Sequence, residues 1–139
     1  MWQTGRYGAE EFQGLAKGYD NVQATTFITR MDLAYRAADL VVSRAGAGTI
    51  SELQILGKPV ILIPSPNVAE DHQRHNAEAL STRGAAVMIL DKDAVAELPG
   101  EIMRLLKDKD AREKLSAEIS AMAMRDSDEK IVDIINQCI

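Results

Sequence analysis

Residues 39–52 read Asp39-Leu40-Val41-Val42-Ser43-Arg44-Ala45-Gly46-Ala47-Gly48-Thr49-Ile50-Ser51-Glu52. The part Leu40–Val42 is short and fully apolar, which is typical of a strand that is covered on both faces of a parallel sheet. Two glycines follow in a turn, and residues 49–56 then carry a helical pattern that ends at Gly57-Lys58-Pro59. A buried strand, a glycine turn and a helix in this order predict one unit of an α/β fold.

The rest of the chain repeats this alternation of strands and helices. Before residue 39, the pattern predicts a helix, a strand and a helix, over residues 9–17, 22–27 and 32–38. After residue 57 it predicts a strand, a helix, a strand and then three helices, over residues 60–63, 71–82, 86–90, 95–106, 111–124 and 128–138. Pro99-Gly100 is expected to interrupt the helix at 95–106. The alternation predicts a Rossmann-like three-layer α/β domain, in which a parallel sheet lies between helices on both faces.

The composition limits the class of protein. The chain has 139 residues, of which 46% are apolar, and this is enough to bury the core of one domain without disulfides. A single cysteine, Cys138, indicates a reducing, cytoplasmic setting. The net charge is −5 and no polybasic run occurs, so a nucleic-acid partner is not expected. No apolar run approaches the ~20 residues of a membrane span, and no signal-peptide pattern opens the chain.

The glycine turn has two interpretations. In open α/β sheets ligands bind at the carboxyl ends of strands, and Gly46 and Gly48 would let the backbone bend tightly and approach a ligand. The N–H groups of the following helix would then favour phosphate oxygens. Alternatively, Thr49-x-x-Glu52 is a capping box that satisfies the helix's own donors. A dinucleotide site of the NAD type is excluded, because the third glycine is missing and Pro64 stands where an acidic residue would hold a ribose.

A second polar loop, residues 65–77, follows the next predicted strand and therefore emerges at the same edge of the sheet. Asp71 is placed to cap the helix that starts there. His72 and His75 are three residues apart, with Glu70 nearby, but this spacing without a further ligand is a weak metal signal, and we predict no metal site. Amide and imidazole groups at this helix start suit sugar hydroxyls, and a solvated, capped helix start is the alternative.

Acidic residues also occur in three closely spaced pairs, Asp91-Lys92-Asp93, Asp108-Lys109-Asp110 and Asp126-Ser127-Asp128. The first pair follows an apolar strand, where metal-dependent enzymes of another fold keep such a pair. A helical segment begins directly after each pair, however, and aspartate is a favoured N-cap residue. We therefore interpret the three pairs as helix caps.

Short segments along nearly the whole chain match one pattern: Gln3-Thr4-Gly5, Phe27-Ile28 with Met31, Ala37–Ala47, Thr49–Glu52, Gly57–Pro59, Asp71-His72-Gln73 and Asn76-Ala77. Together they resemble the MurG family of bacterial glycosyltransferases. The glycine turn and the Asp-His-Gln…Asn-Ala segment form a specific combination because their order and spacing both agree. Either one alone would indicate only the wider superfamily of two-domain glycosyltransferases.

The resemblance implies one half of a GT-B fold, which has two Rossmann-like domains and a deep cleft. Residues 1–139 would be the C-terminal UDP-sugar-binding domain, truncated at its N-terminus. In the family, the acceptor domain, the general base and the first strand of this domain all precede the segment Gln3-Thr4-Gly5. We therefore expect no catalytic residue in this chain and no transferase activity from it alone.

The resemblance also implies roles for single residues. Ile28 would meet the uracil ring and read the base edge with its backbone. The turn from Arg44 to Thr49 would hold the diphosphate in place of a metal, and Glu52 would accept hydrogen bonds from the ribose. The sugar hydroxyls would contact the helix start at residues 72–73. The implied substrate-binding residues are Ile28, Arg44, Gly46, Ala47, Gly48, Thr49, Ile50, Ser51, Glu52, His72 and Gln73. Gly48 departs from the family pattern, in which a larger residue is common.

The implied full-length enzyme transfers N-acetylglucosamine from UDP-N-acetylglucosamine to undecaprenyl-diphospho-muramoylpentapeptide in peptidoglycan synthesis, with inversion and without a metal or cofactor. It would work as a peripheral protein at the cytoplasmic face of the membrane. Two alternatives remain open. A free-standing UDP-sugar-binding subunit would need a separate acceptor-binding partner. A sugar-nucleotide epimerase shares the two-domain architecture, but its catalytic acids and histidine are not found here.

Overall fold

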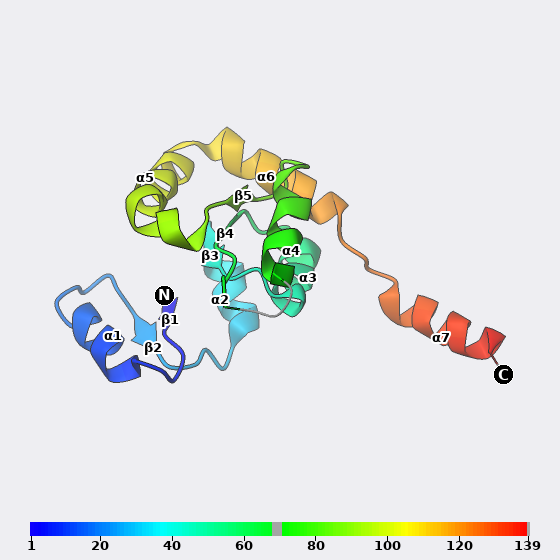
Figure 1. Ribbon diagram of the computed structural model, residues 1–139, viewed down its shortest axis with the longest axis horizontal. Helices are drawn as coiled ribbons and strands as arrows, with labels where there is room; N and C mark the ends of the chain where they lie inside the picture. The colour runs from blue at the N-terminus through cyan, green and yellow to red at the C-terminus, as the bar shows by residue number, and fades with distance from the viewer. Residues whose placement is uncertain (68–70, 139) are drawn as a thin grey trace. The chain divides into compact units, whose positions relative to one another are not determined.

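The chain forms two compact units, which are described separately. The computed structural model describes residues 1–67 and 71–138. The first unit is Met1–Ala38 and the second is Asp39–Ile139. Figure 1 shows the path of the chain and the labels used below.

The first unit is a small α/β arrangement with two parallel strands. Its elements are β1 (Trp2–Gln3), α1 (Ala9–Ala16), β2 (Ala24–Thr25) and α2 (Met31–Ala37). The rings of Trp2 and Phe12 lie 5.4 Å apart and pack α1 against β1. Both predicted helices are confirmed to within one residue at each end. The predicted strand at 22–27 is only two residues long, because β1 offers it only two residues as pairing partners.

The second unit contains a three-stranded parallel sheet in the order β3-β4-β5. Its strands are β3 (Val41–Ser43), β4 (Val60–Leu62) and β5 (Val87–Met88). Val41 pairs with Val60 and Ile61 pairs with Val87, so β4 is the central strand. All three residues of β4 are fully buried, as expected for a central strand that is covered on both faces.

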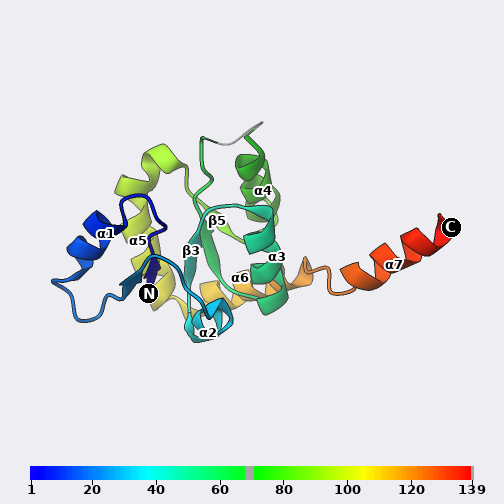
Figure 2. The same cartoon turned by 90° about the horizontal axis from the view of Figure 1, so that it is seen from below.

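Helices cover both faces of this sheet and confirm the predicted α/β class. The helices α3 (Ala47–Leu56) and α4 (His72–Ser81) lie on one side, and α5 (Ala94–Lys107) lies on the other (Figure 2). Ile61 points towards α5, since it forms a buried cluster with Leu105 of that helix and with Leu115 of α6 (Lys109–Ala121). Because side chains alternate along a strand, the neighbours of Ile61 in β4 face α3 and α4. The core therefore fixes β4 between two helical layers.

The predicted break at Pro99-Gly100 is wrong, because α5 runs without interruption through Pro99. Proline lacks the N–H that would bond the carbonyl of Val95, one turn earlier. The Val95 side chain is 92% exposed, so this carbonyl lies in a part of the helix that water reaches. The apolar side chains of Leu98, Ile102 and Leu105 pack α5 onto the sheet on both sides of the proline, and this packing outweighs the lost bond.

The interpretation of the acidic pairs as caps is confirmed at one of three positions. Asp108 is the N-cap of α6, and its side chain accepts a hydrogen bond from the N–H of Ala111 at 2.9 Å. Asp93 and Asp126 also occupy N-cap positions, of α5 and of α7 (Ser127–Gln137), but neither side chain makes a capping bond. Asp126 instead pairs with Lys130, which lowers the pKa of its carboxyl group. Asp91, which opens the short 3-10 helix η2 (Asp91–Asp93), has a different partner, described below.

The C-terminal helix α7 carries apolar side chains that are not part of the core. None of its described residues is buried, and Ile131, Ile134 and Ile135 are each more than half exposed. Among the described residues, no helix combines the length and apolar character that crossing a bilayer requires.

Candidate functional site

Three loops of the second unit leave the sheet at the same edge. They follow β3, β4 and β5 and begin at Arg44, Ile63 and Ile89. Parallel strands all end on one side of a sheet, so these loops are neighbours, as the sequence predicts for the first two. The carboxyl edge of an open α/β sheet is where ligands bind in this class of fold.

The helix after β3 begins with unoccupied hydrogen-bond donors. Gly46 is the N-cap of α3, and the first helical bond runs from the N–H of Ile50 to the carbonyl of Gly46 at 3.0 Å. No side chain caps this end of the helix. Within the part of the chain that the structure describes, the N–H groups of Ala47, Gly48 and Thr49 therefore have no acceptor. Such an end favours an anion, because the donors and the helix dipole act together.

The capping-box interpretation of Thr49 and Glu52 is wrong. The helix α3 begins at Ala47, two residues earlier than predicted, so Thr49 is its third residue and cannot be its N-cap. Glu52 is exposed in the middle of the helix, and its side chain has no hydrogen bond or ion pair to any described residue. A capping box therefore does not account for this turn, and the anion site stays a prediction.

The two glycines of the turn are not required by the bend of the backbone, contrary to expectation. Gly46 has a φ of −70°, which any residue adopts, and Gly48 is not among the glycines with positive φ. A Cβ atom built at either position would meet nothing within 4 Å. Gly48 even costs the helix about 0.5–1 kcal/mol relative to alanine. Packing therefore does not require glycine at either position, and both positions have room for a side chain.

Two side chains of α4 hold the neighbouring loops in place. The Asn76 Nδ2 group donates to the carbonyl of Ala45 at 3.1 Å, and Ala45 is fully buried. The Gln73 Oε1 atom accepts from the N–H of Ser65 at 2.9 Å. Gln73 thus uses its carbonyl to fix the second loop, and its NH₂ group has no acceptor in the described residues. The bond from Asn76 to the glycine turn was not predicted, although Asn76 belongs to the matched sequence pattern.

Arg44 reaches across the sheet edge from the end of β3. Its Nη1 atom donates to the carbonyl of Ile63 at 3.2 Å and also to the carboxylate of Asp91. Arg44 therefore connects the ends of all three strands. The sequence gives no signal for the pair with Asp91, because the two residues are 47 positions apart.

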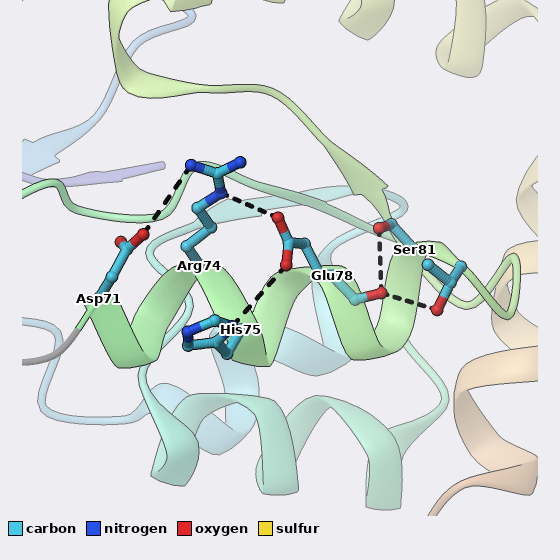
Figure 3. A network of polar contacts seen from close by, with 6 residues as sticks. Asp71, Arg74, His75, Glu78 and Ser81 are labelled. Carbon is cyan, nitrogen blue, oxygen red and sulfur yellow. Dashed lines mark hydrogen bonds and ion pairs between the residues drawn. The ribbon is translucent and has the colours of Figure 1, made fainter.

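The start of α4 differs from the prediction. Asp71 is at the N-cap position, but its side chain makes no capping bond and its φ is +52°, an uncommon value for a residue other than glycine. Its carboxylate lies 3.9 Å from Arg74, which pairs with Glu78 at 2.8 Å, as Figure 3 shows. The hydrogen bond that Arg74 donates to the carboxylate of Glu78 raises the pKa of Arg74. Asp71 thus starts an ion-pair network along α4 instead of a cap.

The two histidines of α4 do not act as a pair. His75 Nδ1 lies 3.8 Å from the carboxylate of Glu78 (Figure 3), and His72 is an exposed residue in the first turn. Among the described residues, no group of three or more histidine, cysteine or acidic side chains could hold a metal ion. Glu70, which the sequence interpretation placed near the histidines, lies outside the described residues.

Ile28 is the one predicted site residue in the first unit; the other ten belong to the second. It follows β2, and its N–H donates to the Gln3 Oε1 atom at 2.9 Å. Gln3 belongs to β1, so this bond closes the loop after β2 onto the neighbouring strand. The backbone N–H of Ile28 is therefore occupied, and the contact of Ile28 with a base stays a prediction.

Comparisons with known proteins agree with one another. The profile of the glycosyltransferase family 28 C-terminal domain matches residues 1–131. A protein of Parabacteroides distasonis named UDP-N-acetylglucosamine--N-acetylmuramyl-(pentapeptide) pyrophosphoryl-undecaprenol N-acetylglucosamine transferase is 53% identical, over 97% of this chain and 37% of its own length. Proteins of the same name from Porphyromonas gingivalis and Cytophaga hutchinsonii are 50% and 46% identical, over 97% and 100% of this chain. The chain spans about a third of the length of these curated relatives.

A solved structure gives the same result for the fold. The crystal structure of Acinetobacter baumannii MurG superposes with a TM-score of 0.85 and 28% identity, over 97% of this chain and 42% of that one. The likeness covers both units and supports the prediction of half of a GT-B fold. Because the family profile matches residues 1–131 of this chain, the chain belongs to the glycosyltransferase family 28 C-terminal domain family.

Proposed function

We propose that this chain is the donor-binding domain of an inverting transferase, in which it binds UDP-N-acetylglucosamine. The observation that carries the proposal is the start of α3. Three neighbouring N–H groups at the carboxyl edge of the sheet have no acceptor in the described residues. Hydrogen bonds to a charged group are worth about 1.5–3 kcal/mol each, so these donors can bind a diphosphate without a metal ion.

The same groups would act in the reaction itself. When the bond between sugar and diphosphate breaks, negative charge develops on the leaving UDP. The fixed N–H groups and the positive end of the α3 dipole stabilise this charge without having to reorganise. Arg44 supplies a full positive charge two residues before Gly46. In this mechanism the domain binds the leaving group, and the acceptor and its base are supplied by the remainder of a longer protein.

The remaining predicted contacts complete the donor site. The carboxylate of Glu52 is exposed and unpaired among the described residues, so it can accept hydrogen bonds from ribose hydroxyls. Gln73 keeps its NH₂ group for a sugar hydroxyl while its carbonyl fixes Ser65. Ile28 belongs to the first unit, and its carbonyl is the backbone group that could read the edge of a base, since its N–H is bound to Gln3.

The whole protein would transfer N-acetylglucosamine to undecaprenyl-diphospho-muramoylpentapeptide at the cytoplasmic face of the membrane. The names of the relatives support this reaction. They do not favour an epimerase or a free-standing subunit, because each of these relatives is named as a transferase and is about three times as long as this chain.

Calorimetric titration of the chain with UDP, in magnesium and in a chelator, tests the proposal. We expect saturable binding with the same affinity under both conditions, and tighter binding of UDP-N-acetylglucosamine than of its C4 epimer. A tenfold dependence on magnesium, equivalent to about 1.4 kcal/mol, would contradict a diphosphate site made of N–H groups. Absence of UDP binding would refute the donor-domain assignment.

A further inference from the structure

The pair of Arg44 and Asp91 joins the ends of two strands that are not neighbours. Arg44 follows β3 and Asp91 follows β5, with β4 between them. Neighbouring strands lie about 4.8 Å apart, so the arginine side chain crosses roughly 10 Å. On the way, its Nη1 atom also donates to the carbonyl of Ile63 at the end of β4. The guanidinium is therefore held over the carboxyl edge of the sheet.

The fold itself gains little from this pair. The side chains of Arg44 and Asp91 are 55% and 38% exposed, and exposed ion pairs contribute only about 0–1 kcal/mol. Asp91 does not cap a helix either, because η2 has Leu90 as its N-cap and no side-chain capping bond. The pair with Asp91 thus adds little stability, although it holds Arg44 at the edge of the sheet where ligands bind in this class of fold.

The contacts of Arg44 leave most of its donors available. Arginine carries five N–H groups, and the two on Nη1 are directed to Ile63 and Asp91. The three on Nε and Nη2 have no acceptor among the described residues. The guanidinium is thus fixed through one nitrogen, while the other two nitrogens can bind phosphate oxygens.

We propose that Asp91 is a positioning residue for the nucleotide diphosphate and that it acts through Arg44. By holding the guanidinium in place before the nucleotide arrives, it removes the need to immobilise a flexible arginine on binding. This inference rests on the proposed function. The sign of the effect is diagnostic, because the carboxylate of Asp91 itself repels a diphosphate. Its removal would strengthen binding directly, so a loss of affinity requires an indirect effect such as the release of Arg44.

The test compares two single substitutions in the same loop by calorimetric titration of the full chain with UDP. Asp91→Ala should weaken binding about three- to tenfold, the equivalent of ordering one freed side chain. Asp93→Ala is the matched control, because it removes the same charge two residues later and the Asp93 side chain is paired with no described residue. This variant should bind UDP as well as the wild type or slightly better. Asp91→Glu, which can still reach Arg44, should recover part of the loss. Thermal unfolding of each variant verifies that it is folded.

A second pair of variants separates positioning from a structural effect. In an Arg44→Met background, Asp91→Ala should no longer weaken UDP binding. The inference is overturned if Asp91→Ala binds UDP as tightly as the wild type, or if it loses the same factor when Arg44 is absent. Failure of the proposed function would look different, since the wild-type chain itself would then not bind UDP.

Discussion

Replacing Gly46 with aspartate should make the chain more stable and its binding of UDP weaker. Gly46 is the N-cap of α3, its backbone is extended, and a Cβ atom there meets nothing within 4 Å. An aspartate side chain can accept from the N–H of Gly48 or Thr49. A side-chain cap improves on glycine by a few tenths of a kcal/mol, and a negative charge at a helix N-terminus adds about 0.3–1 kcal/mol. The expected gain in free energy of unfolding is about 0.5–1.5 kcal/mol.

The same carboxylate competes with the diphosphate for the donors of α3. It would also stand about 4 Å from a bound phosphate, where the repulsion of two unit charges is about 1 kcal/mol in water and about 4 kcal/mol near a protein surface. The affinity for UDP should therefore fall by at least about fivefold. A helix start without a ligand role would show the gain in stability alone.

Two further substitutions of Gly46 separate the causes. Asparagine caps the helix without a charge, so it should keep the gain of a few tenths of a kcal/mol and lose less affinity than aspartate. Alanine neither caps nor carries charge, and it should fall below glycine in stability. Denaturant unfolding and calorimetry measure both quantities for all three variants. An aspartate variant that is more stable and binds UDP as well as the wild type would refute the assignment of the α3 donors to the diphosphate.

Three other predictions concern single side chains. Glu52→Gln should leave the unfolding midpoint unchanged, because the Glu52 side chain has no partner in the described residues. The same substitution should weaken binding of UDP-N-acetylglucosamine by about ten- to a hundredfold. Unchanged affinity would remove Glu52 from the ribose site. Asp108→Ala should lower the free energy of unfolding, measured with denaturant, by about 1 kcal/mol, since Asp108 caps α6. Asp126→Ala should lower it less, because the Asp126 side chain makes no capping bond. Equal losses would contradict the observed difference in capping. The hydrogen bond from Arg104 lowers the pKa of the Glu101 carboxyl group. This ion pair therefore contributes its full stabilisation, about 0.2–1 kcal/mol, at a pH above the ordinary carboxyl pKa. The contribution disappears as the pH falls through the lowered pKa of Glu101. Arg104→Gln should therefore lose less stability than the wild type on acidification, and an equal loss would show that the pair contributes nothing.

The sequence was sufficient to predict the kinds of elements and their order. Alternating apolar strands and amphipathic helices identified the α/β class, and β3 and β4 lie within one residue of the prediction. The start of α3 was misplaced by two residues because Thr49 and Glu52 have the spacing of a capping box, a preference of isolated helices. In the folded unit, the burial of Ile50 and Leu53 sets how α3 packs on the sheet, and the helix extends back to Ala47.

The candidate site was predictable only in part. Strand order alone places the glycine turn and the second loop on one edge, so local patterns were enough to bring these loops together. The bonds from Asn76 to Ala45 and from Arg44 to Asp91 join residues 31 and 47 positions apart. Such contacts depend on packing distances across the sheet, and no periodicity in one sequence encodes them.

Backbone N–H resonances of the chain during titration with UDP test the central claim most directly. The account predicts that the amides of Ala47, Gly48 and Thr49 show the largest downfield shifts, as expected for donors that gain a charged acceptor, and that a chelator does not alter them. Shifts that appear only with magnesium, or that are largest in α5, α6 or α7 while these three amides stay unchanged, would contradict it.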